Sequence, residues 1–274
     1  MMLRHNLLLI FRNFKRFKST FFINLIGLSS GLACALLIYL WVNDELNFDK
    51  FHANDAQLFQ VIERSEENGQ VIIHEATQGP LAAAMAKDLP EVVSAVSVMS
   101  LAREGIFLTM KHGEKTAKPT GIFADKNFFE TFSFPLASGN PKQALSDRNA
   151  IVISENVAQH LFGSVEQALG KSIEWEVMGM KRQSVVSGVF KKLPTNNSMD
   201  FDFVLTQELF LNEIQPIGQK WWNEGPQTYL LLKKGTDINQ FNAKIANFIE
   251  GYFPETIFTT SVRPYSSAYL YGNY

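Results

Sequence analysis

The sequence has one cysteine and few histidines, and both shortages exclude kinds of chemistry. Cys34 is the only cysteine among 274 residues, so no intramolecular disulfide can form. No histidine stands in an H-x-x-x-H pair or beside a cysteine, so a metal site has no starting pattern. The histidines are His5, His52, His74, His112 and His160. We expect no catalytic residue, cofactor or metal.

Two features of the sequence resemble functional sites, but we do not interpret either of them as one. The stretch Gly163 to Ser172 reads GSVEQALGKS, but its spacing departs from the phosphate-binding G-x-x-x-x-G-K-[ST] pattern, and it follows a predicted helix and enters a predicted strand, the reverse of a phosphate loop. The carboxylates Glu174 and Glu176, like Asp200 and Asp202, alternate along predicted strands. We interpret each pair as part of a solvated strand face rather than as an acid–base pair.

His52, Trp221 and Trp222 are candidates for a functional site, but we expect a surface or a packing role for each instead. We interpret His52, close to Asp49, as a surface residue with a polar contact. The adjacent Trp221 and Trp222 precede a predicted strand, and we expect them to pack, buried, beneath it.

Charge is missing altogether from Phe21 to Val42. A helix of about 22 residues is ~33 Å long and spans a hydrocarbon core of ~30 Å. A cleaved signal peptide has an apolar core of only ~7–15 residues. Ala33-Cys34-Ala35 imitates a cleavage site and Cys34 a lipidation site, but the apolar run continues to Val42. The sequence therefore predicts an uncleaved transmembrane helix over 19–42.

The flanks of this run predict its orientation. Residues 4–18 carry five basic residues and no acidic one, whereas Asp44, Glu45 and Asp49 follow the run. Since Lys and Arg are retained on the cytoplasmic side, we expect a cytoplasmic N-terminus and a periplasmic chain after about residue 43. Apolar residues at three- and four-residue steps predict a basic amphipathic helix over 1–18, lying on anionic lipid. The expected membrane-interface anchors are Arg12, Lys15, Arg16, Lys18 and Trp41.

Small residues recur along one face of the predicted span. Gly27, Gly31 and Ala35 are four residues apart, a small-xxx-small spacing that lets helix backbones approach closely. We interpret these residues as a packing face for another transmembrane helix, because a lone anchor needs no such face.

The remaining 43–274 segment alternates short strands and helices. The formal net charge of the chain is −2, and no basic face appears outside the first 18 residues, so nucleic acid is not an expected partner. The mixed order of elements predicts an α+β domain of two lobes. The expected elements are a hairpin turning at Asn68-Gly69, helices over 80–88, 126–132, 154–162 and 238–252, and strands over 92–101, 105–111, 118–123, 150–153, 171–177, 183–190, 199–206, 228–233 and 257–263.

The order and spacing of several blocks resemble the N-terminal part of FtsX-like, MacB-type permease subunits of ABC transporters. The blocks are FFINLIGLSSGLACALLIYLWVNDELNFDKFH, FDKFHANDAQLFQVIER, AIVISENVAQHLFGSVEQALGKSIEW, VVSGVFKKLPTNNSMDFDFVLT and WWNEGPQTYLLLKKGTDINQF. The resemblance covers essentially the whole chain. It implies one transmembrane helix followed by a MacB-like periplasmic core domain, in the bacterial inner membrane.

The resemblance also implies partners and a mechanism. In this family a separate cytoplasmic ATPase drives a permease dimer, and the permease converts that movement into periplasmic movement used for efflux or export. We therefore expect membrane lipid, a second permease half in a homodimer or pseudo-dimer, and an ABC ATPase as partners. The family has three further membrane helices, so we expect 43–274 to be incomplete at its C-terminus and the chain to be a permease fragment.

Two other functions stay open at this point. The alternative is a single-span sensor or accessory protein with an extracytoplasmic ligand-binding domain, although 18 cytoplasmic residues are too few for an output module. An anchored exported enzyme is the third possibility, and the missing site chemistry disfavours it.

Overall fold

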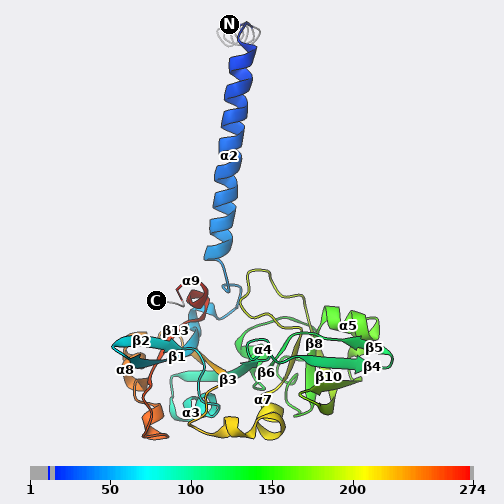
Figure 1. The fold of residues 1–274 in the computed structure, drawn as a ribbon, viewed down its shortest axis with the longest axis vertical. Helices are drawn as coiled ribbons and strands as arrows, with labels where there is room; N and C mark the ends of the chain where they lie inside the picture. The colour runs from blue at the N-terminus through cyan, green and yellow to red at the C-terminus, as the bar shows by residue number, and fades with distance from the viewer. Residues whose placement is uncertain (1–11, 13–15, 272–274) are drawn as a thin grey trace. The chain divides into compact units, whose positions relative to one another are not determined.

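The computed structural model describes residue 12 and residues 16–271. The chain divides into two units, Met1–Asn47 and Phe48–Tyr274. Most of the predicted amphipathic helix over 1–18 lies outside the described residues, so that expectation stays a prediction. The first unit contains helix α2 (Lys18–Leu46), and the second contains a mixed sheet with its helices (Figure 1).

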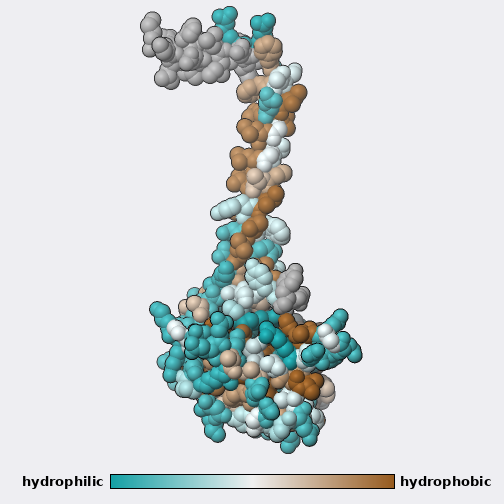
Figure 2. Space-filling model, turned by 90° about the vertical axis from the view of Figure 1, so that its left-hand side faces the viewer, coloured by the Kyte–Doolittle hydropathy of each residue, from teal (hydrophilic) through white to brown (hydrophobic). Residues whose placement is uncertain are grey.

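Helix α2 is, among the described residues, the one helix long and apolar enough to cross a membrane. Its 29 residues correspond to ~44 Å of helix, longer than a hydrocarbon core of ~30 Å. None of its residues is buried, and apolar side chains cover most of its middle part (Figure 2). The helix contains the predicted span 19–42 and continues through Asp44 and Glu45 to Leu46.

The described strands of the second unit form one 13-stranded sheet. Its path is β13 (Thr259–Pro264), β1 (Leu58–Glu67), β12 (Gln227–Leu232), β3 (Val92–Ser100), β6 (Gly121–Ala124), β11 (Phe203–Thr206), β8 (Ala150–Ser154), β10 (Met180–Phe190), β9 (Ser172–Val177), β4 (Leu108–His112) and β5 (Lys115–Ala117). Off this path, β2 (Gln70–His74) pairs with β1, and β7 (Leu136–Ser138) pairs with β10. The pairs β6–β11 and β8–β10 are parallel and the others antiparallel.

Helices pack at both ends of this sheet and on its middle strands. Helix α8 (Ile238–Ile245) packs on β13, α5 (Glu155–Phe162) lies near β4 and β5, and α3 (Leu81–Asp88) packs on β3 and β12 (Figure 1). The predicted α+β class is therefore confirmed. The helices are α3 (Leu81–Asp88), α4 (Phe128–Thr131), α5 (Glu155–Phe162), α6 (Val165–Ala168), α7 (Gln207–Leu209), α8 (Ile238–Ile245) and α9 (Ala268–Tyr271), with the π-helix η2 (Phe210–Ile214) and the 3-10 turns η1 (Asp55–Gln57), η3 (Pro216–Gln219), η4 (Ile249–Gly251) and η5 (Tyr265–Ser267).

Local signals explain several boundaries. Asn68 and Gly69 both have positive φ, 53° and 76°, as the predicted two-residue hairpin between β1 and β2 requires. The Ser154 hydroxyl accepts a hydrogen bond from the Val157 amide, and Gly163 ends α5 at φ 94°. These two residues cap and stop the helix predicted over 154–162.

Two predicted helices are too long, and two strands were missed. The predicted helix over 126–132 is limited to Phe128–Thr131. The predicted helix over 238–252 ends at Ile245, and the next carbonyl, that of Ala246, accepts a hydrogen bond from the Thr260 amide of β13 instead of continuing the helical ladder. The strands β5 and β7 have three residues each, too few for a period-2 pattern to indicate them.

A row of polar residues divides the interior on one face of the sheet. Along β3, Ala95 belongs to the core near α3 and α8, and Met99 belongs to the core near α5. Ser97 lies between them at 2% exposure. Thr228 is its partner on β12. Asp125 directly follows β6 and accepts a hydrogen bond from the Ser97 amide, and Gln207 directly follows β11 as the first residue of α7. We name these four residues the polar seam.

The polar seam gives the domain two lobes around a continuous sheet. The Ser97 hydroxyl and both polar atoms of the Gln207 side chain are buried without a hydrogen-bond partner in the described chain. Such groups are costly unless water reaches them, so the seam is a weak layer between two well-packed cores.

A close approach between Gly79 and Gly218 fastens the segment that precedes α3 to η3. A Cβ atom on Gly79 would clash with the Gly218 carbonyl oxygen, and only a shift of the backbone could relieve this clash. We predict that Gly79→Ala destabilises the domain by about 1–3 kcal/mol, measured by urea unfolding.

The matched control is Gly251→Ala, since a Cβ there has nothing within 4 Å. Equal effects of the two substitutions would show that the close approach does not constrain the fold.

Candidate functional site

The small-residue face of α2 is open in the structure. Cβ atoms built on Gly27 and Gly31 would have nothing within 4 Å. Ala35, one turn further along, is exposed as well. The Ser30 hydroxyl donates back to the Gly27 carbonyl at 3.1 Å, so it is satisfied within the helix. The packing role of this face stays a prediction.

The predicted interface anchors are described in part. Arg12, Arg16, Lys18 and Trp41 are exposed, and the Arg16 guanidinium lies 5.4 Å from the centre of the Phe17 ring. Lys15 lies outside the described residues. Their role at a membrane interface stays a prediction.

The segment after α2 is buried in the second unit, which sequence reasoning missed. Asp49 is 0% exposed and His52 is 4% exposed, so the predicted surface role of His52 is wrong. Its ring packs among Phe132, Phe134 and Tyr265. Burial lowers the pKa of His52 to about 4, so the imidazole is neutral at pH 7.

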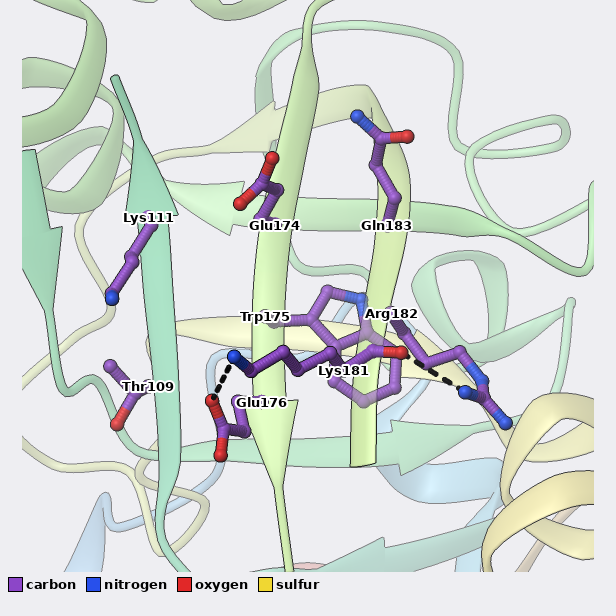
Figure 3. Close-up of a pocket in the computed structure, with 8 residues that line it drawn as sticks. All are labelled: Thr109, Lys111, Glu174, Trp175, Glu176, Lys181, Arg182 and Gln183. Carbon is purple, nitrogen blue, oxygen red and sulfur yellow. Dashed lines mark hydrogen bonds and ion pairs between the residues drawn. The ribbon is translucent and has the colours of Figure 1, made fainter. Parts of the chain in front are cut away.

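The open cavity of Figure 3 lies on strands β4, β9 and β10 and has a volume of about 430 Å³. Lys111 stands opposite Glu174 across β4–β9, and Lys181 stands opposite Glu176 across β9–β10. The Lys181 amine lies 4.0 Å from Glu176. Each carboxylate therefore faces a lysine on a solvated strand face, as predicted.

Two other predictions need correction. Asp200 and Asp202 precede β11, which begins at Phe203, and Asp202 is held by the Thr120 amide and the Ser154 hydroxyl. Trp222 is 57% exposed, so the expected burial of both tryptophans is wrong. Trp221 stacks on Tyr252 at 4.3 Å.

The described residues offer no starting point for metal-dependent chemistry. They contain no group of three His, Cys, Asp or Glu side chains suited to a metal ion. The stretch that imitates a phosphate loop is the end of α5, the short α6 and the entry to β9, a context that cradles no phosphate.

The carboxyl of Glu63 is buried at the point where β1 stops pairing with β12 and begins to pair with β2. Glu63 is 0% exposed, and one of its oxygens accepts a hydrogen bond from the Gln78 side-chain amide at 3.0 Å. Its Oε1 and the Gln78 Oε1 have no partner in the described chain. Burial raises the pKa of Glu63 to about 8, so the protonated acid is the form that fits here.

This burial predicts a pH-dependent stability. Because the folded protein holds the Glu63 proton up to about pH 8 and the unfolded chain releases it near pH 4.5, stability contributed by this group is full below pH 4.5 and is lost as pH rises toward 8. Glu63→Gln removes this titration and keeps the shape. We predict that the wild type loses on the order of a few kcal/mol more than Glu63→Gln between pH 5 and 8, by urea unfolding. Parallel pH profiles would refute the assignment.

The comparisons with known proteins bear on this fold. The family model of the MacB-like periplasmic core domain matches residues 21–248, and the chain belongs to this family, that of periplasmic domains of ABC transporter permeases. No curated protein matches the chain.

Solved structures show the same fold at low identity. A domain assigned to a permease protein from Porphyromonas gingivalis is 20% identical, with a TM-score of 0.65, over 78% of this chain and 93% of that one. The periplasmic region of MacB from Actinobacillus actinomycetemcomitans is 12% identical, with a TM-score of 0.52, over 75% and 88%. The extracellular domain of the noncanonic ABC-type transporter YknZ from Gram-positive bacteria is 13% identical, with a TM-score of 0.53, over 75% and 99%.

Proposed function

We propose that this chain is a non-catalytic permease subunit, or a fragment of one, that relays the movement of a separate cytoplasmic ABC ATPase to its own domain outside the membrane, for efflux or export. The observation that carries the proposal is the family match over residues 21–248, which begins inside α2 and includes most of the sheet. The described residues hold no metal-binding cluster, and a mechanical role requires none.

The proposal places α2 in the bacterial inner membrane with residues 1–18 in the cytoplasm and the domain in the periplasm. The support is the charge-free run from Phe21 to Val42 and the basic residues that precede it, which are retained inside. Lipid then covers the apolar side chains that α2 exposes.

Orientation is testable with single cysteines in a Cys34→Ser background. We predict that Glu114→Cys, on an exposed turn between β4 and β5, reacts with a membrane-impermeant maleimide in intact spheroplasts. Asn13→Cys is expected to react only after lysis. The reverse pattern, or labelling of both sites in intact spheroplasts, would contradict the proposed topology.

Assembly tests the function itself. We predict that the tagged chain, purified in mild detergent from its native membrane, brings with it an ATPase whose hydrolysis vanadate inhibits. Gly31→Leu is expected to reduce recovery of the partner at least about tenfold, because a bulky side chain separates closely packed helix backbones.

The matched control is Ala33→Leu, which adds similar bulk about 200° around the helix from Gly31 and should leave recovery unchanged. Purification of the wild type alone, without ATPase activity, would overturn the proposal in favour of a single-span sensor or accessory protein. Equal recovery with both variants would show that the small-residue face is not the contact.

A further inference from the structure

The chain enters the domain through a buried aspartate with an uncommon backbone conformation. Asp49 lies three residues beyond the end of α2 and has φ 60°, in the left-handed region that side chains other than Asn and Asp rarely adopt. It is 0% exposed although it carries a carboxylate. Such a residue is held in place by what surrounds it.

The first partner of Asp49 is the long connection between β10 and β11, residues 191–202. The Asp49 amide donates to the Asn196 carbonyl at 2.8 Å, and the Asp49 Oδ1 accepts from the Ser198 amide at 2.8 Å. A carboxylate that accepts a backbone N–H in a buried place makes a strong bond. These contacts link the entry of the chain to two strands in the middle of the sheet.

Ser198 and the residues on either side of Asp49 contact the segment after β13. The Ser198 hydroxyl lies 3.1 Å from the Tyr265 hydroxyl, and Tyr265 is 2% exposed. Phe48 stacks on Tyr269, with ring centres 3.7 Å apart and planes at 11°. The His52 ring packs on Tyr265 at 5.4 Å. The entry segment therefore also contacts the end of an edge strand.

We propose that residues 48–52, 195–199 and 265–269 form one rigid joint, with Asp49 as the positioning residue that holds the three segments together. We name these segments the entry joint. The proposal rests on the proposed relay function and specifies where movement enters the domain. Force that arrives at Phe48 passes at once to the β10–β11 connection and to β13, and so to both lobes, rather than straightening a flexible linker.

The charge and conformation of Asp49 allow selective substitutions. Asp49→Gly adopts φ 60° without strain and removes only the carboxylate. Asp49→Asn keeps an oxygen acceptor for the Ser198 amide and tolerates the left-handed conformation. Lys50→Ala changes an exposed neighbour and serves as the matched control.

The structural test is hydrogen exchange of the full chain in lipid nanodiscs. For Asp49→Gly we expect exchange about tenfold faster both in 195–199 and in 265–269, with the melting temperature of the domain little changed. Asp49→Asn and Lys50→Ala should behave as the wild type. Faster exchange confined to 195–199 would overturn the joint, because Asp49 would then hold only its own neighbour.

If Asp49→Gly does not fold, Tyr265→Phe, which removes only a hydroxyl, should accelerate exchange in the same two segments, and no change there would overturn the joint.

The coupling test uses the complex with its ATPase. In the wild type, ATP with vanadate is expected to change exchange in 191–202 relative to the nucleotide-free complex. Asp49→Gly should hydrolyse ATP within about twofold of the wild-type rate and lose this difference, whereas Asp49→Asn keeps it. A difference retained by Asp49→Gly would overturn the joint as the point of entry. A wild type without any difference would overturn the relay function, while the nanodisc experiment still decides the joint.

Discussion

The lack of charge in α2 is the constraint on which the rest of the molecule depends. Its side chains from Phe21 to Val42 find no burial within the described chain, so only lipid or other helices can remove them from water. With α2 in the membrane as proposed, the folded domain begins within a few residues of the span, because Asp49 is already buried in the domain three residues after α2 ends.

The fold was predictable where the sequence carries local, periodic signals. The Asn68-Gly69 turn, the Ser154 cap and the Gly163 stop each have a mechanism that acts within a few residues. The helix predicted over 80–88 was equally clear, and α3 buries Leu81, Ala84 and Met85 on one face. These signals suffice for the α+β class and for α2, since a charge-free run of this length has few other structural meanings.

The site was not predictable to the same extent, because its contacts join residues far apart in the chain. The sequence around His52 gives no indication that Phe132, Phe134 and Tyr265 bury its ring. Polar residue types are usually exposed, so His52 was interpreted as a surface residue, and the burial of Asp49 was not foreseen. A buried polar group needs a partner from elsewhere in the fold, and for Asp49 that partner is the Ser198 amide, 149 residues away.

The polar seam and the entry joint together suggest how one sheet can both hold its shape and move. The seam, with the unpartnered Ser97 hydroxyl and Gln207 side chain, is weaker than the cores on either side, so it is where a strained domain yields first. The entry joint is the stiffer region, because buried hydrogen bonds and stacked rings hold it together. For the proposed relay we therefore expect movement to enter through the entry joint and to be taken up at the seam, because neither packed core deforms as easily.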